Sequence, residues 1–219
     1  MNHFIIDTGG SRALAAVQTL QDQAAKDAQS AEVIVVIGRD VRSQAGALAQ
    51  WRDKSAVLLE LGTECLGVYT GEGRGLEGSN VLGFARFGLG DGEPSKLVEL
   101  VRQPCTAEAA LAAAGKFFEA AGLQVAVCGD FAGRIIDRLV RPYYNAALRR
   151  LDEGLATADD LDLTLKLGLG YPEGPIALLE RTGLAHHHDV TKVLFDTYGE
   201  AAYAPARRAR VAKQRQGNL

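Results

Sequence analysis

The feature that most constrains this chain is a run of helical segments between residues 130 and 203, each bounded by residues that start or stop helices. Apolar residues recur at helical spacing over Ile136 to Leu151, and Gly154 follows where a left-handed cap would end a helix. Thr157 then stands where an N-cap would begin a second helix. Pro175 can occupy the first turn of a third, since its missing N–H costs nothing there. The pattern predicts an all-helical region.

The part of the chain before this region alternates short apolar runs with helical spacing, which predicts a parallel sheet covered by helices. The candidate strands are Phe4 to Ile6, Val33 to Ile37, Ala56 to Leu61, Val81 to Phe84 and Leu123 to Val127. Helical spacing marks Ala13 to Leu20 and the alanine-rich run from Thr106, the expected N-cap, to Ala121. Strand signals vanish after Cys128. We therefore predict an α/β domain over residues 1–128 and an all-α domain over residues 129–219.

Composition places the chain among globular proteins, because 219 residues of which 47% are hydrophobic can bury a core. A net charge of −3 gives no general attraction to nucleic acid, and no apolar run is long enough to span a membrane. The first residues lack the basic and apolar segments of a secretory signal, so we expect a cytoplasmic location. The three widely spaced cysteines predict reduced thiols, with neither a disulfide framework nor a zinc site.

Six ordered blocks of the helical region resemble the C-terminal helical domain of the 3-hydroxyacyl-CoA dehydrogenases. They are Gly133 to Arg138, Asn145 to Ala147, Glu153 to Ala156, Asp160 to Gly168, Tyr171 to Pro175, and Gly183-Leu184. The segment from Tyr198 to Pro205 looks like the ending of the long, two-part 3-hydroxybutyryl-CoA dehydrogenases of phenylacetate breakdown. The second half of those proteins has a reduced Rossmann domain followed by a helical domain. The resemblance implies the same architecture here, with a helical domain that forms a homodimer contact and one wall of an acyl-CoA cleft.

The resemblance does not extend to the glycine fingerprint that holds NAD in this family. The turn after the first expected strand, Asp7 to Ser11, contains no G-x-G-x-x-G, and roughly thirty residues before Val33 leave room for one strand and one helix. A literal G-x-G-x-x-G at Gly73 to Gly78 lies in the glycine-rich loop Gly62 to Asn80, which leads into a strand and not into a helix. We expect no bound NAD, although this loop could close over another ligand.

The family's catalytic residues are matched only in part. The block that resembles the family's histidine-bearing G-x-H-F-F-N-P has Ala85 at the position of the catalytic base. Glu99 matches the glutamate that orients this histidine, and Asp137 matches the asparagine of the family's N-R pair. A methyl group cannot take up a proton at working pH. Glu99 and Asp137 are therefore the remaining catalytic candidates, and the alternative for Glu99 is an ordinary ion-paired or exposed strand carboxylate.

Two further clusters have alternative interpretations. Three consecutive histidines, His186 to His188, cannot all face one metal on a helix, because successive side chains point about 100° apart; we predict no metal site. The basic residues of the tail are Arg207, Arg208, Arg210, Lys213 and Arg215. They are typical of a solvated last helix, with charges favoured near its C-terminal end. The alternative is a grip on a phosphate or an acidic partner.

Three functional hypotheses follow. The first is an enzyme of acyl-CoA oxidation, a 3-hydroxybutyryl-CoA dehydrogenase subunit that borrows its missing parts from a companion chain with the fingerprint and the histidine. The second is a non-catalytic module that binds acyl-CoA or a partner without turnover. The third is an unrelated activity in the Gly62 to Asn80 loop, where the sequence has no catalytic constellation. We favour the second, and we expect a homodimer held chiefly by the helical domain, with neither nucleic acid nor a membrane as partner.

Overall fold

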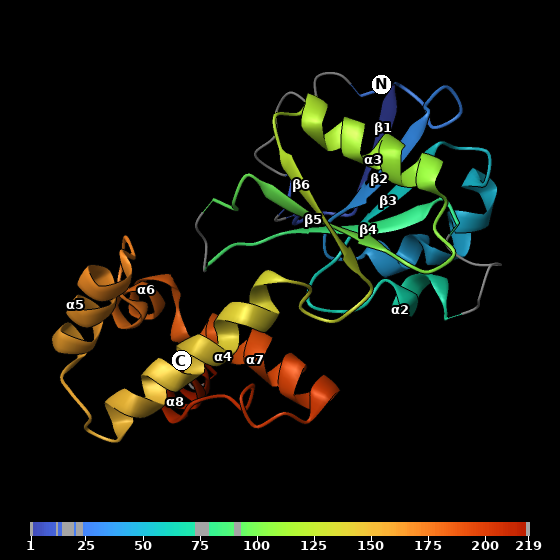
Figure 1. Cartoon of the computed structure of the whole chain (residues 1–219). Coiled ribbons are helices and arrows are strands. Elements are labelled where there is room, and N and C mark those ends of the chain that lie inside the picture. The colour runs from blue at the N-terminus through green and yellow to red at the C-terminus, as the bar shows by residue number, and fades with distance from the viewer. Residues whose placement is uncertain are drawn as a thin grey trace. The chain divides into compact units, whose positions relative to one another are not determined.

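The computed structural model describes residues 2–11, 13–14, 20, 24–72, 79–89 and 93–217. The chain forms two compact units, one of Met1–Phe87 with Glu93–Arg134, the other of Gly88–Gly92 with Ile135–Leu219. The first contains a sheet and the second is helical (Figure 1), so the predicted order of an α/β region followed by an all-α region is confirmed. The units divide between Arg134 and Ile135, shortly after the composition change at residue 128.

Some of the expected features cannot be compared with the structure. Most of the segment from Ala13 to Leu20 and the whole glycine motif Gly73 to Gly78 lie outside the described residues. Within the described part of the chain, no helix is long and apolar enough to cross a membrane.

The first unit is built on six strands that lie side by side in the order of the chain. They are β1 His3–Asp7, β2 Val33–Ile37, β3 Ala56–Glu60, β4 Val81–Arg86, β5 Leu97–Arg102 and β6 Gln124–Gly129. All neighbouring strands are parallel except β4 and β5, which pair antiparallel. The continuous apolar runs of β2 and β3 are fully buried, as expected for parallel strands covered on both faces. β5 was not among the expected strands, because Glu99 interrupts its apolar run.

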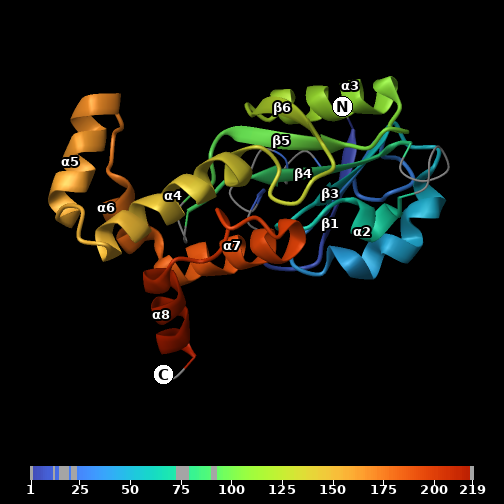
Figure 2. The ribbon, with the colours of Figure 1, turned by 60° about the horizontal axis from the view of Figure 1, so that its bottom comes forward.

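Helices pack on both faces of this sheet (Figure 2). One face is covered by α3 (Glu108–Ala120), whose Phe117 and Phe118 are buried against it. The other face is covered by the 3-10 helix η1 (Val41–Trp51) and the short helix α2 (Gly67–Thr70). Alternate side chains of β2 enter the two cores: Val33, Val35 and Ile37 face α3, and Ile34 and Val36 face η1. This period of two follows from strand geometry.

The predicted N-cap of α3 was wrong. Ala107 precedes the helix in extended conformation and has no capping side chain. The Thr106 hydroxyl instead accepts a hydrogen bond from the Gln103 backbone N–H at 2.9 Å. Threonine can bond its own turn in this way as readily as it caps a helix, so the residue type alone did not fix the helix start.

The second unit consists of five described helices. They are α4 Ile136–Asp152, α5 Ala158–Leu169, α6 Pro175–Thr182, α7 Leu184–Tyr198 and α8 Arg207–Gln216. Gly154 follows α4 with a φ of 73°, and the Thr157 hydroxyl accepts from the Asp160 N–H at 3.2 Å, so both predicted helix ends are confirmed. The start of α6 at Pro175 is confirmed as well.

The start of α6 is held by a carboxylate of α5. Asp162 accepts hydrogen bonds from the Ile176 N–H at 2.9 Å and the Ala177 N–H at 2.8 Å. Gly174 permits this approach, because a Cβ there would overlap the Asp162 side chain. Asp162 thus caps α6 with two charge-assisted bonds, a role that its place in the middle of another helix does not reveal.

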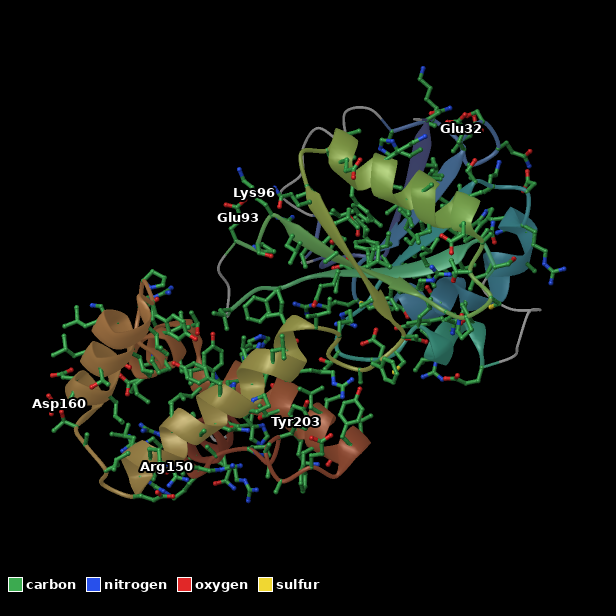
Figure 3. All side chains as sticks on the ribbon, in the orientation of Figure 1. Glu32, Glu93, Lys96, Arg150, Asp160 and Tyr203 are labelled. Atoms are coloured by element: carbon green, nitrogen blue, oxygen red, sulfur yellow. The ribbon has the colours of Figure 1, made fainter. Side chains whose placement is uncertain are left out.

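Tyr203, labelled in Figure 3, compensates for a proline inside α4. Pro142 has no N–H to donate to the Arg138 carbonyl one turn earlier. The buried Tyr203 hydroxyl donates to that carbonyl at 3.4 Å. The Tyr203 ring also packs against Tyr198 with centroids 5.8 Å apart. The segment after α7 is thereby fastened to α4.

Candidate functional site

The two residues at the positions of the family's catalytic pair lie opposite each other. Ala85 of β4 pairs with Glu99 of β5 in the antiparallel register. Residues directly opposed in this way have Cβ atoms about 4.5–5.5 Å apart on one face of the sheet. Both side chains are buried, and Glu99 is only 4% exposed. The structure therefore brings together Ala85 and Glu99, the two residues that the resemblance matches to the family's base and its orienting glutamate.

A buried arginine that the sequence did not single out lies beside Glu99. Arg134 Nε is 3.9 Å from Glu99 Oε2. The guanidinium also donates hydrogen bonds to the backbone oxygens of Gly62 and of Glu64, the latter at 3.2 Å. Arg134 has a φ of 50°, in the left-handed region that side chains usually avoid. Its surroundings therefore impose this backbone conformation, which directs the guanidinium toward the carboxylate.

Arg134 affects the chemistry that is open to Ala85 and Glu99 on this pair of strands. A guanidinium stays protonated at any physiological pH, so Arg134 cannot take a proton from a substrate hydroxyl. An unpaired charge at this depth would be strongly destabilising, whereas an ion pair is tolerated. The geometry agrees with the alternative interpretation of Glu99 as an ion-paired strand carboxylate.

Two cysteines of this unit, Cys65 and Cys128, are not activated nucleophiles. Cys65, Cys105 and Cys128 are free thiols, as the sequence predicted. Burial, assisted by the negative charge of Glu99, raises the pKa of Cys128 to about 11. Burial likewise raises the pKa of Cys65. Reactive cysteines have lowered pKa values, so neither thiol has the environment of a catalytic one.

A second buried carboxylate, Glu60, lies where the first three strands end. Its Oε1 accepts the Ala13 N–H at 2.9 Å, and its Oε2 accepts the Gly38 N–H at 2.8 Å. Ala13 follows the turn after β1, and Gly38 directly follows β2. This edge is where parallel sheets bind ligands, and a dinucleotide fold places its pyrophosphate there. Glu60 was not a candidate, although a charge inside the expected apolar strand Ala56 to Leu61 was a visible signal.

The turn after β1 is closed against the turn after β2. The Thr8 hydroxyl donates to the Ile37 carbonyl at 2.8 Å, and the Arg39 N–H donates to the Gly9 carbonyl at 2.8 Å. Gly38 has a φ of 110°, and a Cβ there would overlap Thr8 and the Gly9 backbone. Bonds within the protein thus occupy the turn that contains the glycine fingerprint in dinucleotide folds.

The order of the strands also differs from that of a dinucleotide-binding sheet. Dinucleotides bind at a switch point, where the strand order of a doubly wound sheet reverses. The described sheet runs from β1 to β6 in sequence order. Among the described strands there is accordingly no such reversal.

Asp137 belongs to the helical unit and is engaged in a buried network there. Its Oδ1 lies 2.7 Å from Nε of Arg141, a side chain that is 1% exposed. Arg141 Nη1 donates to His187 Nδ1 at 3.2 Å, and His187 Nε2 donates to Asn145 Oδ1 at 3.1 Å. Arginine can only donate, so this chain requires neutral His187 with its proton on Nε2. The Asn145 amide also bonds the segment before α8, through Ala202 O and Ala206 N.

His187 is held in the neutral form. Burial and then the positive charge of Arg141 lower its pKa to about 3. Its neighbour His188 has Nδ1 3.1 Å from Asp189 Oδ1. No group of three potential metal-binding side chains is present in the described ranges. Asp137 and His187 therefore belong to a structural network of the helical unit.

Most of the basic residues of the tail are paired within the helical unit. Arg207 and Arg208 each lie 2.8 Å from Asp152, and Lys213 lies 2.7 Å from Asp189. A groove of about 540 Å³ beside them is lined by Arg149, Asp152, Glu153, Ala204, Pro205, Ala206, Arg207 and Arg210. The charged side chains of its lining are three arginines and two carboxylates.

The match to a known family falls almost wholly within the helical unit. The family model of the 3-hydroxyacyl-CoA dehydrogenase C-terminal domain matches residues 133–218. This helical unit belongs to the 3-hydroxyacyl-CoA dehydrogenase family. The match covers all six sequence blocks on which the predicted resemblance rests. The Asp162 cap and the buried network are thus features of a dehydrogenase-family helical domain in this chain.

The curated relatives match about half of this chain. Human mitochondrial hydroxyacyl-coenzyme A dehydrogenase is 38% identical over 105 residues, which are 48% of this chain and 32% of the human protein. The 3-hydroxybutyryl-CoA dehydrogenase of Mycobacterium tuberculosis H37Rv is 36% identical over 110 residues, 50% of this chain and 38% of that protein. The chain therefore spans about a third of the length of the curated relatives that it matches.

Solved structures of dehydrogenases share the fold over a longer part of the chain. The 3-hydroxybutyryl-CoA dehydrogenase of Escherichia coli K12 has a TM-score of 0.71 at 22% identity, over 85% of this chain and 41% of that one. The (S)-3-hydroxybutyryl-CoA dehydrogenase of Ralstonia eutropha has a TM-score of 0.70 at 22% identity, over 86% of this chain and 68% of that one. These likenesses confirm the predicted fold, a reduced Rossmann-like sheet followed by the family's helical domain.

Proposed function

We propose that this chain is a protein of acyl-CoA oxidation that binds acyl-CoA or a partner protein and does not by itself catalyse NAD-dependent dehydrogenation. The observation behind this proposal is the pairing of Ala85 with Glu99, with Arg134 as a charge partner of the carboxylate. General acid or base help contributes roughly 10²- to 10⁴-fold to a rate. Neither the methyl group nor the guanidinium can supply it.

Hydrogen bonds at the carboxyl edge of the sheet support the proposal that this chain does not bind NAD. NAD binding needs free backbone amides and close approach of the pyrophosphate. Here the amides of Ala13 and Gly38 are already bonded to Glu60. We therefore expect NADH to show no saturable fluorescence change below millimolar concentration, and saturable micromolar binding would contradict the proposal.

The activity test follows NADH absorbance with acetoacetyl-CoA, in both reaction directions, on the full chain purified away from host dehydrogenases. We expect no turnover, together with saturable binding of acyl-CoA by calorimetry. Ala85→His should remain inactive, because the cofactor site is still closed. Turnover that tracks the protein and falls in Glu99→Gln, but not in the exposed control Glu119→Gln, would overturn the proposal.

The second candidate is a dehydrogenase subunit that borrows its catalytic parts from a companion chain. The helix α5 favours it, because none of its residues is buried and it exposes Leu163 and Leu167 on one face. Apolar side chains that gather on one surface commonly mark a protein contact. Turnover that appears only after addition of a companion with the fingerprint and the histidine would favour this candidate. The same face is the surface through which we propose a homodimer.

A further inference from the structure

We propose that Glu60 is a built-in anion, which fills a cradle of backbone amides that would otherwise bind a phosphate-sized oxyanion. The inference rests on the proposed loss of cofactor binding and explains how the fold tolerates it. A doubly wound sheet leaves amides at its carboxyl edge for a ligand. In this chain the ligand's place is taken by a side chain.

The geometry of the carboxylate is that of a bound anion. One of its oxygens accepts the Ala13 N–H at 2.9 Å, and the other accepts the Gly38 N–H at 2.8 Å. The donors come from two different connections, one after β1 and one after β2, while Glu60 ends β3. Backbone N–H groups that converge on one point from separate turns form the kind of concavity that binds phosphate.

The cradle does not depend on Glu60 for its shape. Gly38 is fixed by its φ of 110° and by contact with Thr8 and Gly9, so its N–H keeps its direction. The Thr8 hydroxyl also accepts the Asp40 N–H at 3.1 Å while donating to Ile37. Near Ala13, the Leu14 N–H donates to the Ser11 hydroxyl at 3.2 Å. Bonds that do not involve Glu60 thus hold both donors.

Removal of the Glu60 carboxylate should lower the stability of the fold, and the test measures whether phosphate restores it. Amides that lose their acceptor inside a protein are destabilising, because water does not replace the lost bond. Truncation to Glu60→Ala should therefore lower the melting temperature and leave both N–H groups facing an empty, oxyanion-sized space. Inorganic phosphate should fill that space and restore part of the lost stability, since anything that binds only the folded state stabilises it.

The first experiment measures melting temperature against inorganic phosphate, with sodium chloride at matched ionic strength as reference. We expect a saturable rise for Glu60→Ala and none beyond the chloride reference for the wild type. Glu60→Gln should not respond, because its side chain still fills the space. The matched control is Glu64→Ala, which removes another carboxylate bonded to a single amide, that of Gly62. Equal phosphate responses in Glu60→Ala and Glu64→Ala would overturn the proposal.

The second experiment locates the anion. In protein labelled with ¹⁵N-glycine, the Gly38 cross-peak of Glu60→Ala should move with phosphate and saturate with the same dissociation constant as the thermal shift. A Gly38 signal that phosphate leaves in place would overturn the proposal. If Glu60→Ala is unfolded without phosphate, it should fold on addition, and protein that stays unfolded would contradict the idea. NADH binding by the wild type would instead refute the proposed function.

Discussion

Acidification from pH 7 to about pH 5 should weaken the helical unit through one residue, His187. The folded state holds this imidazole neutral, with a pKa of about 3 in place of the usual 6.5. The unfolded chain takes up the proton near pH 6.5 and the folded unit does not. Because the unfolded state then binds more protons, the free energy of unfolding falls as the pH falls. The contribution is fully present above pH 6.5 and is lost progressively toward pH 3.

The size of the effect follows from the same values. Each pH unit below 6.5 costs about 1.4 kcal/mol per group, so the interval down to pH 5 costs about 2 kcal/mol. Most carboxylates do not titrate in this interval, which separates His187 from general acid denaturation. The control is His187→Gln, whose amide can accept from Arg141 and donate to Asn145 without titrating.

The assay is urea unfolding at both pH values, with a separate signal for each unit. The protein has a single tryptophan, Trp51, in the sheet unit, so its fluorescence reports on that unit. Most of the tyrosines lie in the helical unit, so near-ultraviolet dichroism of tyrosine reports chiefly on the latter. The wild type should lose about 2 kcal/mol more than His187→Gln in the tyrosine signal. Equal losses in the two proteins would refute the argument.

Three further outcomes are expected. Asp162→Ala should destabilise the helical unit by about 1–2 kcal/mol in urea, because it uncaps α6, and an unchanged midpoint would contradict the capping role. Tyr143→Phe should be neutral or stabilising by up to about 1 kcal/mol, because its buried hydroxyl has no hydrogen-bond partner within the described residues; a loss above that size would disprove this. Light scattering should give a dimer for the wild type and a monomer for Leu167→Lys on the exposed face of α5, whereas a wild-type monomer at micromolar concentration would rule out the proposed contact.

The helix ends of the second unit could be predicted because they depend on local chemistry. Gly154, Thr157 and Pro175 each act within a few residues of their own position, through a left-handed cap, a side-chain acceptor and a missing donor. The strands of the first unit were likewise visible as apolar runs. The strand β5 was not predicted, because the sequence does not distinguish a buried charge such as Glu99 from an exposed one. The distinction requires its partner in the fold, Arg134.

Two residues of the candidate site, Arg134 and Glu60, were missed for the same reason, whereas Glu99 was among the expected candidates. Arg134 and Glu99 lie on different elements, and Glu60 bonds amides that are 22 and 47 residues away in the chain. Sequence spacing reports contacts along one helix or strand, whereas these contacts depend on the register of the sheet. Ala85 could be recognised as a lost base only through the family pattern, and its opposition to Glu99 required the strand pairing.

The order of the strands also bears on how this protein acquires its structure. In a doubly wound sheet the first strand lies in the middle and waits for segments made much later. Here each described strand from β2 through β6 pairs with the strand that precedes it in the chain. Pairings between neighbours along the chain lower the contact order and the loop-closure entropy that precedes each new contact. A sheet of this kind can grow strand by strand as it leaves the ribosome, before the helical region has been synthesised.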